Sequence, residues 1–284
     1  AEAVSRIAQL GGLDGDASSN LLSWTGERSG DVRMDFRNET FVSRALKNPK
    51  VRGCPICLRE EAEAKPGAPL EAMVMRGDWQ LREALICVRH QHPLVLLWDR
   101  NIPTERFDMS ARLGSILEHL LDGSFERPQI IPSAYDLWLD KRLENGSDAS
   151  WLAQHSIYAA TTFCRLLGTE LLRLPENADF DGPDRIRAAQ SAGFDVAIGG
   201  EAAVDNALDE LAAHASSHND LPNKAFGDLF KALARPYLHE ECFDAFRRIL
   251  WERIVAIWPV AADEVKIGNR RGFVEEANVR DWDS

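Results

Sequence analysis

The chain has 284 residues, of which 45% are hydrophobic and 27% charged, as in an ordinary folded protein and unlike collagen, mucin or a disordered chain. Its longest uninterrupted apolar runs, such as residues 94–98, are far shorter than the roughly 20 residues needed to cross a bilayer, so we expect no membrane association. The net charge of −12 disfavours a chain that, as a whole, binds nucleic acid mainly by neutralising phosphates.

The charge is unevenly distributed along the chain. Residues 27–59 carry eight basic and four acidic side chains, whereas residues 175–222 carry ten acidic and two basic ones. An anionic partner should therefore meet the first third of the chain, and the acidic stretch should face water or a basic protein. We consider six basic residues as phosphate contacts, with a solvated basic face as the equally open alternative: Arg33, Arg37, Arg44, Lys47, Lys50 and Arg52.

Residues 1–52 are predicted to form short helices. Val4, Ile7 and Leu10 share one helical face, Gly11-Gly12 ends that helix, and a second apolar patch begins near residue 21. Two small helices around a glycine turn are compatible with a helix-turn-helix or with a packing layer. We favour the packing layer, because neither helix is rich in the Arg, Asn or Gln residues that read DNA bases.

Residues 53–100 are predicted to form a metal-binding module with short strands. Cys54-x2-Cys57 is followed, after 29 residues, by Cys87-x2-His90. Each short loop lets two ligands converge on one ion, and the spacer brings the second pair across to the first, as a tetrahedral zinc site requires. His92 is the one alternative ligand, and His90 is preferred because its spacing mirrors that of the first pair.

Other interpretations of these cysteines remain open but are weaker. A thioredoxin-like redox pair would leave the Cys-x2-His pair unexplained. A zinc deaminase needs a His-x-Glu motif upstream of its cysteines. Isolated buried cysteines would leave the ordered spacing unexplained. Four protein ligands leave no position for a catalytic water, so we predict one structural zinc ion. An odd number of cysteines, five in all, is more typical of a reducing interior than of a disulfide framework, and we expect a cytoplasmic protein.

Residues 101–284 are predicted to form a larger helical domain. Apolar residues with helical spacing predict helices over residues 113–121, 135–143, 151–167, 202–215 and 242–258, with Gly168 ending the third of them. Cys164 and Cys242 lie on apolar helical faces and are predicted to be small buried hydrophobes. The fold class is therefore mainly α, with the small zinc module between N-terminal helices and this domain.

The chain lacks the sequence motifs of the common enzyme families. It has no Gly-rich nucleotide loop, no Gly-x-Ser-x-Gly elbow, no His-Glu-x-x-His and no kinase signature. We therefore predict a protein that is not an enzyme and has no catalytic residues.

Several motifs resemble the TniQ family. The resemblance lies in Arg-Gly-Cys-Pro-Ile-Cys-Leu-Arg-Glu-Glu at residues 52–61, Trp-Gln-Leu at 79–81, Cys-Val-Arg-His at 87–90 and Pro-Leu at 93–94. It implies a non-catalytic role in DNA transposition, in which the protein helps to select the target site. It also implies action beside a separate transposase and an AAA+ ATPase, and in some elements dimerisation on an RNA-guided surveillance complex.

Carried over by position, the resemblance assigns zinc to Cys54, Cys57, Cys87 and His90. Many family members carry a further Cys-x2-Cys after this site, and residues 97–100 have none, so one zinc ion is expected. Two alternative functions remain. A zinc-containing DNA-binding transcriptional regulator of a mobile element would bind a defined operator without transposase or ATPase. A metalloenzyme would lack the fourth protein ligand.

Overall fold

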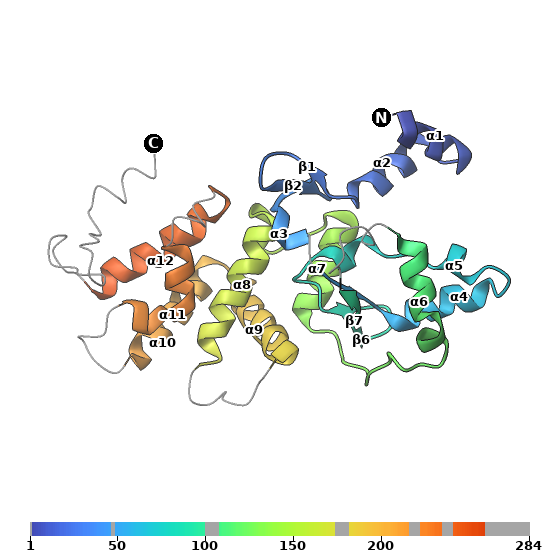
Figure 1. The fold of residues 1–284 in the computed structure, drawn as a ribbon. Helices are drawn as coiled ribbons and strands as arrows, with labels where there is room; N and C mark the ends of the chain where they lie inside the picture. The colour runs from blue at the N-terminus through green and yellow to red at the C-terminus, as the bar shows by residue number, and fades with distance from the viewer. Residues whose placement is uncertain are drawn as a thin grey trace. The chain divides into compact units, whose positions relative to one another are not determined.

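The structure is a computed structural model, and it describes residues 2–46, 49–99, 108–173, 182–215, 222–234 and 241–258. The chain divides into two compact units, residues 1–147 and residues 148–284. Helices dominate both units, and short strands occur in the first of them (Figure 1). The mainly α fold class is thereby confirmed, whereas the three-segment division at residues 52 and 100 stays a prediction.

The N-terminal unit begins with two helices and a small antiparallel sheet, in the order α1 (Glu2–Leu10), α2 (Gly15–Ser23), β1 (Glu27–Arg28), β2 (Arg33–Phe36), β3 (Glu39–Val42) and α3 (Ser43–Leu46). The central strand, β2, pairs with both β1 and β3. Met34 and Phe36 are buried and alternate with exposed Arg33 and Asp35, which is the period of a half-buried strand. The helices expected throughout residues 1–52 are therefore replaced by a sheet over residues 27–42.

Trp24, at the end of α2, joins this sheet to the following part of the unit. Its ring meets Phe36 edge to face, with ring centroids 5.7 Å apart, and Phe36 meets Phe41 in the same way at 5.9 Å. A methyl group built on Gly77 would lie 2.5 Å from the Trp24 ring, so this close approach requires glycine. The Gln80 side chain also donates a hydrogen bond to the Trp24 carbonyl.

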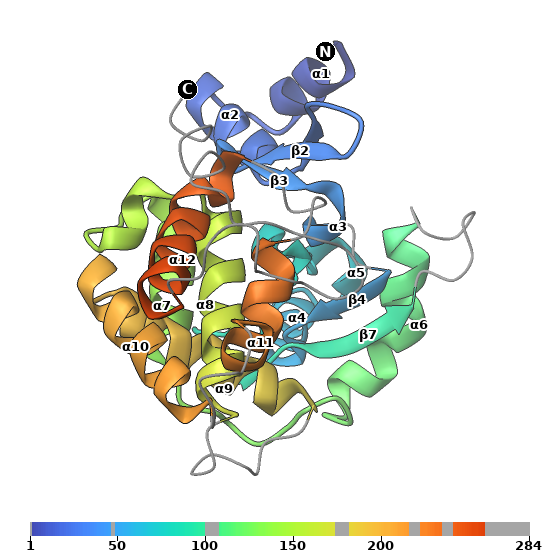
Figure 2. The same cartoon turned by 90° about the vertical axis from the view of Figure 1, so that its left-hand side faces the viewer.

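The middle of the unit contains two small two-stranded sheets and short helices, namely β4 (Lys50–Gly53), α4 (Pro55–Ala64), α5 (Pro69–Ala72), the 3-10 turn η1 (Gly77–Gln80), β5 (Ile86–Cys87), β6 (His92–Pro93) and β7 (Val95–Asp99). β4 and β7 run side by side and antiparallel (Figure 2), and β5 pairs with β6. A methyl group on Gly53 would lie 2.7 Å from Leu97 and 3.0 Å from Trp79. The end of β4 is therefore packed tightly just before the first cysteine.

Two longer helices complete the unit, α6 (Met109–Leu121) and α7 (Ala134–Asn145), where the apolar spacing predicts them. α6 packs on α4 and α5 (Figure 1). α7 starts with a capping box, in which the Ser133 side chain accepts from the Asp136 amide and the Asp136 carboxylate accepts from the Ser133 amide. It ends at Gly146, whose φ of +70° is the left-handed conformation that favours glycine.

The second unit is helical in the part of the chain that the structure describes. Its elements are the 3-10 turn η2 (Trp151–Gln154), α8 (Ile157–Leu171), α9 (Gly182–Ala197), α10 (Glu201–His214), α11 (Pro222–Leu233), the 3-10 turn η5 (Glu241–Phe243) and α12 (Asp244–Ile257). Stacked Phe163 and Phe246 rings, 4.2 Å apart, link α8 to α12. Cys164 is fully buried as predicted, whereas Cys242 is only half-buried.

Gly168 does not end a helix as expected. α8 continues through it to Leu171, because Gly168 lies where α8 crosses α9. A methyl group on Gly168 would lie 1.8 Å from the Ala189 carbonyl oxygen, and one on Gly193 would lie 1.8 Å from the Cys164 carbonyl oxygen. The glycine lets two backbones touch, a requirement that depends on a partner helix and is not visible in a local sequence pattern. Among the described residues, no helix combines the length and apolar character that crossing a membrane requires.

Candidate metal centre

The two halves of the Cys/His pattern are formed by different local structures. Cys54 follows β4 as the N-cap residue of α4, with extended backbone, and Pro55 then starts the helix that carries Cys57 in its first turn. Cys87 ends β5, and His90 lies in the tight connection to β6, where Gln91 has a φ of +50°. A helix start and a hairpin turn thus present the two ligand pairs.

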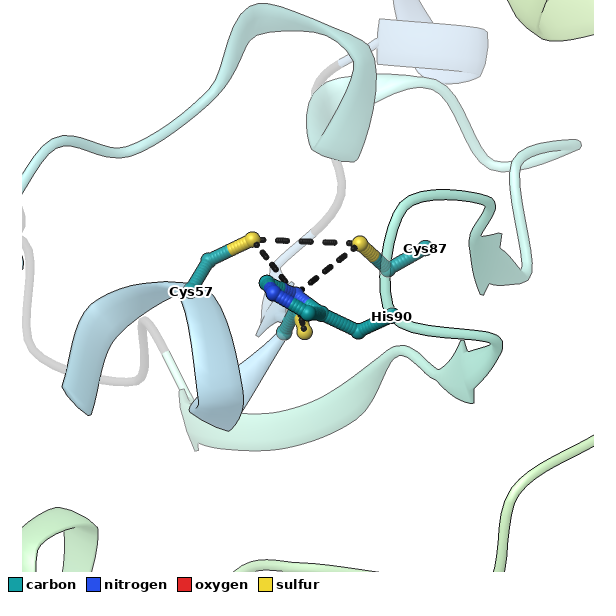
Figure 3. Close-up of side chains that lie close together, drawn as sticks. Cys57, Cys87 and His90 are labelled. Atoms are coloured by element: carbon teal, nitrogen blue, oxygen red, sulfur yellow. Dashed lines mark hydrogen bonds between the residues drawn. The ribbon is translucent and has the colours of Figure 1, made fainter. Parts of the chain in front are cut away.

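The four predicted ligands come together. The Cys57 and Cys87 sulfurs lie 3.8 Å apart, and His90 Nδ1 lies 3.5, 3.2 and 3.7 Å from the sulfurs of Cys54, Cys57 and Cys87. Figure 3 shows Cys57 and Cys87 turned toward each other and toward the imidazole of His90. All four potential ligand atoms lie within 4.8 Å of one another, and the three cysteines are buried. This cluster could hold one metal ion.

The thiols of the cluster do not ionise independently. Hydrogen bonds from Cys54 and Cys57 lower the pKa of Cys87 to about 2, because they stabilise its thiolate. The pKa of Cys57 is raised far above its usual range by its hydrogen bonds with Cys54 and Cys87 and by burial. One of the three thiols is therefore charged readily, and a bound cation would favour ionisation of the other two.

The imidazole of His90 has a defined orientation. Nδ1 faces the sulfurs, while Nε2 lies 3.1 Å from a carboxylate oxygen of Glu60. The same oxygen accepts a 2.7 Å hydrogen bond from Arg89. Glu60 is not among the residues predicted from the sequence, although the spacing Cys57-x2-Glu60 places both side chains on one face of α4.

His92, the alternative ligand, lies outside the cluster and has another role. It is completely buried, and its Nδ1 and the Pro93 carbonyl oxygen are 2.7 Å apart. Its Nε2 accepts a 2.7 Å hydrogen bond from the Arg127 amide. Both ring nitrogens are thus used by the backbone, and His92 ties the segment after α6 to β6.

The basic residues considered as phosphate contacts lie in two different kinds of environment. The Arg37 guanidinium stacks over Trp24 at 4.3 Å and donates from all three of its nitrogens to protein acceptors. Arg52 is half-buried and donates to the carbonyls of Leu81 and Arg82. Arg33, Arg44 and Lys50 are exposed, and Lys47 lies outside the described residues.

Comparison with known protein families agrees with this geometry. Residues 2–94 match the TniQ family model. The chain carries a TniQ domain. The matched region includes all four side chains of the cluster, and a TniQ domain indicates a transposition-associated protein. No curated protein and no solved structure was found to match the chain.

Proposed function

We propose that this protein is a non-catalytic TniQ-type accessory factor that acts in target-site selection during DNA transposition. It would bridge target DNA, or a targeting complex, to the transposition machinery. The observation that supports this function best is the TniQ match over residues 2–94, which contains the metal cluster. Its proposed partners are the AAA+ ATPase and the transposase of the same element, and a second copy of the chain.

We further propose that the cluster binds one structural zinc ion. For tetrahedral zinc with Zn–S of about 2.3 Å and Zn–N of about 2.05 Å, sulfurs should lie about 3.8 Å apart, and sulfur and nitrogen about 3.6 Å apart. The measured 3.8 Å between the Cys57 and Cys87 sulfurs, and the 3.2–3.7 Å from the sulfurs to His90 Nδ1, fit this geometry. Thiolate and imidazole donors also favour zinc over the oxygen-seeking ions.

The proposed role of zinc is to supply folding free energy to a module with little core of its own. When bound, the ion joins the start of α4 to the β5–β6 hairpin, two structures whose sheets have only two strands each. Because the ligand set consists of four protein side chains, the arrangement supports a structural rather than a catalytic metal. Three reduced thiols in one cluster also support a cytoplasmic site of action.

For contact with DNA, we propose the exposed basic side chains Arg33, Arg44 and Lys50, together with Lys47. Arg37 and Arg52 are half-buried, so their side chains are less accessible to a phosphate than the exposed side chains of Arg33, Arg44 and Lys50. With few phosphate contacts, affinity for DNA should be modest and should decrease with salt. Recruitment by protein partners would then provide most of the target selection.

A reconstituted transposition assay tests this function. The assay combines this protein, the transposase and the ATPase of the same element, a donor DNA and a target plasmid, and insertion sites are sequenced. We expect insertions at a defined target only when the protein is present, and loss of that selectivity with the Cys57→Ser variant. A wild-type protein that binds an operator and changes transcription, without altering the insertion pattern, would instead support the transcriptional regulator.

A further inference from the structure

We propose that Glu60 is a positioning residue for the metal centre: its carboxylate accepts the Nε2 hydrogen of His90 and so directs the Nδ1 lone pair toward the three sulfurs. The proposal rests on the proposed metal site and adds a residue to it. Glu60 Oε2 lies 3.1 Å from His90 Nε2, on the opposite side of the ring from the 3.2 Å contact between Nδ1 and the Cys57 sulfur.

The position of Glu60 follows from the helix that carries the first ligand pair. Cys57 and Glu60 are three residues apart on α4, and residues at this spacing share a helical face. The carboxylate oxygen that meets His90 also accepts from the Arg89 guanidinium at 2.7 Å. Glu60 therefore connects α4, which bears Cys57, to the turn that bears His90.

The chemistry of imidazole explains why this contact matters for metal binding. A neutral imidazole has one N–H and one lone pair, so a proton fixed on Nε2 leaves Nδ1 as the metal ligand. A carboxylate that accepts the N–H hydrogen makes the imidazole a stronger metal ligand and fixes the rotation of the ring. The His90 side chain is 12% exposed and that of Glu60 is 44% exposed, so water partly replaces the carboxylate when it is removed. The expected loss of zinc affinity therefore lies at the lower end of the range that is usual for residues that orient a metal ligand.

The test compares Glu60→Ala with a matched control, Glu63→Ala, in the full-length protein. Glu63 lies one turn further along α4, is exposed, and pairs with Arg59 at 3.9 Å rather than with the cluster. Both variants lose one negative charge and gain alanine, which favours helix. Zinc affinity is measured by competition with a colorimetric chelator, and the His90 ring nitrogens are followed by NMR in the zinc-loaded protein.

We expect Glu60→Ala to weaken zinc binding about tenfold and to remove the slowly exchanging Nε2 hydrogen signal of His90. Glu63→Ala should change neither property. Glu60→Gln, whose amide oxygen still accepts from Nε2, should retain that signal and bind zinc more tightly than Glu60→Ala. Equal affinities for Glu60→Ala and Glu63→Ala, or an unchanged Nε2 signal in Glu60→Ala, would overturn the proposal. Wild-type protein that binds no zinc would instead refute the proposed metal site.

Discussion

Replacing Arg37 with alanine distinguishes a structural arginine from one that contacts DNA. Arg37 lies in the two-residue turn between β2 and β3, and its φ of +53° is sparsely populated for residues with a Cβ. Its side chain holds this turn by binding the Asn20 and Ser23 side chains and the carbonyls of Leu143 and Glu144. Alanine retains the Cβ, so the backbone strain is unchanged while the hydrogen bonds disappear.

The loss of local stability expected for Arg37→Ala follows from these contacts. The four hydrogen bonds are 2.5–2.7 Å long, and the guanidinium lies 4.3 Å from the centre of the Trp24 ring. Hydrogen bonds of a half-exposed charged group contribute about 0.5–1 kcal/mol each, and an exposed cation–π contact about as much. We therefore expect the free energy of opening the β2–β3 region to fall by about 2.5–5 kcal/mol.

The assay is hydrogen–deuterium exchange of the β2–β3 amides in the full-length chain, with Arg33→Ala as the control. Arg33 is exposed on β2, so its loss removes the same charge and should change local stability by less than about 0.5 kcal/mol. DNA binding is then titrated at several salt concentrations, and the slope of log K against log salt concentration is compared. Arg33→Ala should make this slope smaller by about 0.9 if Arg33 contacts a phosphate, and Arg37→Ala should not change it. Equal stability of the two variants, or a smaller salt slope for Arg37→Ala, would refute this reasoning.

Two further predictions concern the second unit. Gly193→Ala should destabilise the protein by about 1–3 kcal/mol in urea denaturation, because its new methyl group would meet the Cys164 backbone. In the control Gly114→Ala, on α6, the new methyl group meets only a side chain at 3.6 Å, so this change should be neutral or stabilising. An equal effect of the two substitutions on stability would contradict this expectation. Burial raises the pKa of Glu170, so the folded state holds its proton more tightly than the unfolded state, and this group makes stability fall as pH rises above the ordinary Glu pKa of about 4.5. Glu170→Gln should remove that decrease above pH 4.5, and an unchanged pH profile of stability would argue against it.

The candidate metal centre was predictable because its information is local. Each ligand pair needs only a two-residue spacer, and Pro55 and the short β5–β6 hairpin convert that spacing into converging side chains. The sequence left His92 as an alternative to His90, and the structure shows why spacing alone could not decide. The choice between the two histidines depends on the Arg127 amide, which lies 35 residues away from His92 and donates a hydrogen bond to its ring.

The N-terminal sheet was not predictable from the sequence, because its turn depends on residues that are distant in the chain. A two-residue hairpin turn usually carries Asn-Gly or Asp-Gly, because both central residues need positive φ. Here the turn is Arg37-Asn38, with φ values of +53° and +62°, and no glycine marks it. The acceptors that compensate its strain include the end of α7, more than 100 residues away. Tertiary contacts therefore override the local pattern at this turn.

The most direct test of the account is a measurement of metal content and coordination in the reduced, full-length protein. Elemental analysis gives the number of zinc ions per chain, and X-ray absorption at the zinc edge gives the donor atoms and their distances. We expect one zinc ion bound by three sulfurs and one nitrogen, with Zn–S of about 2.3 Å. Protein without bound metal, a disulfide among Cys54, Cys57 and Cys87, or an oxygen donor in place of His90 would contradict it.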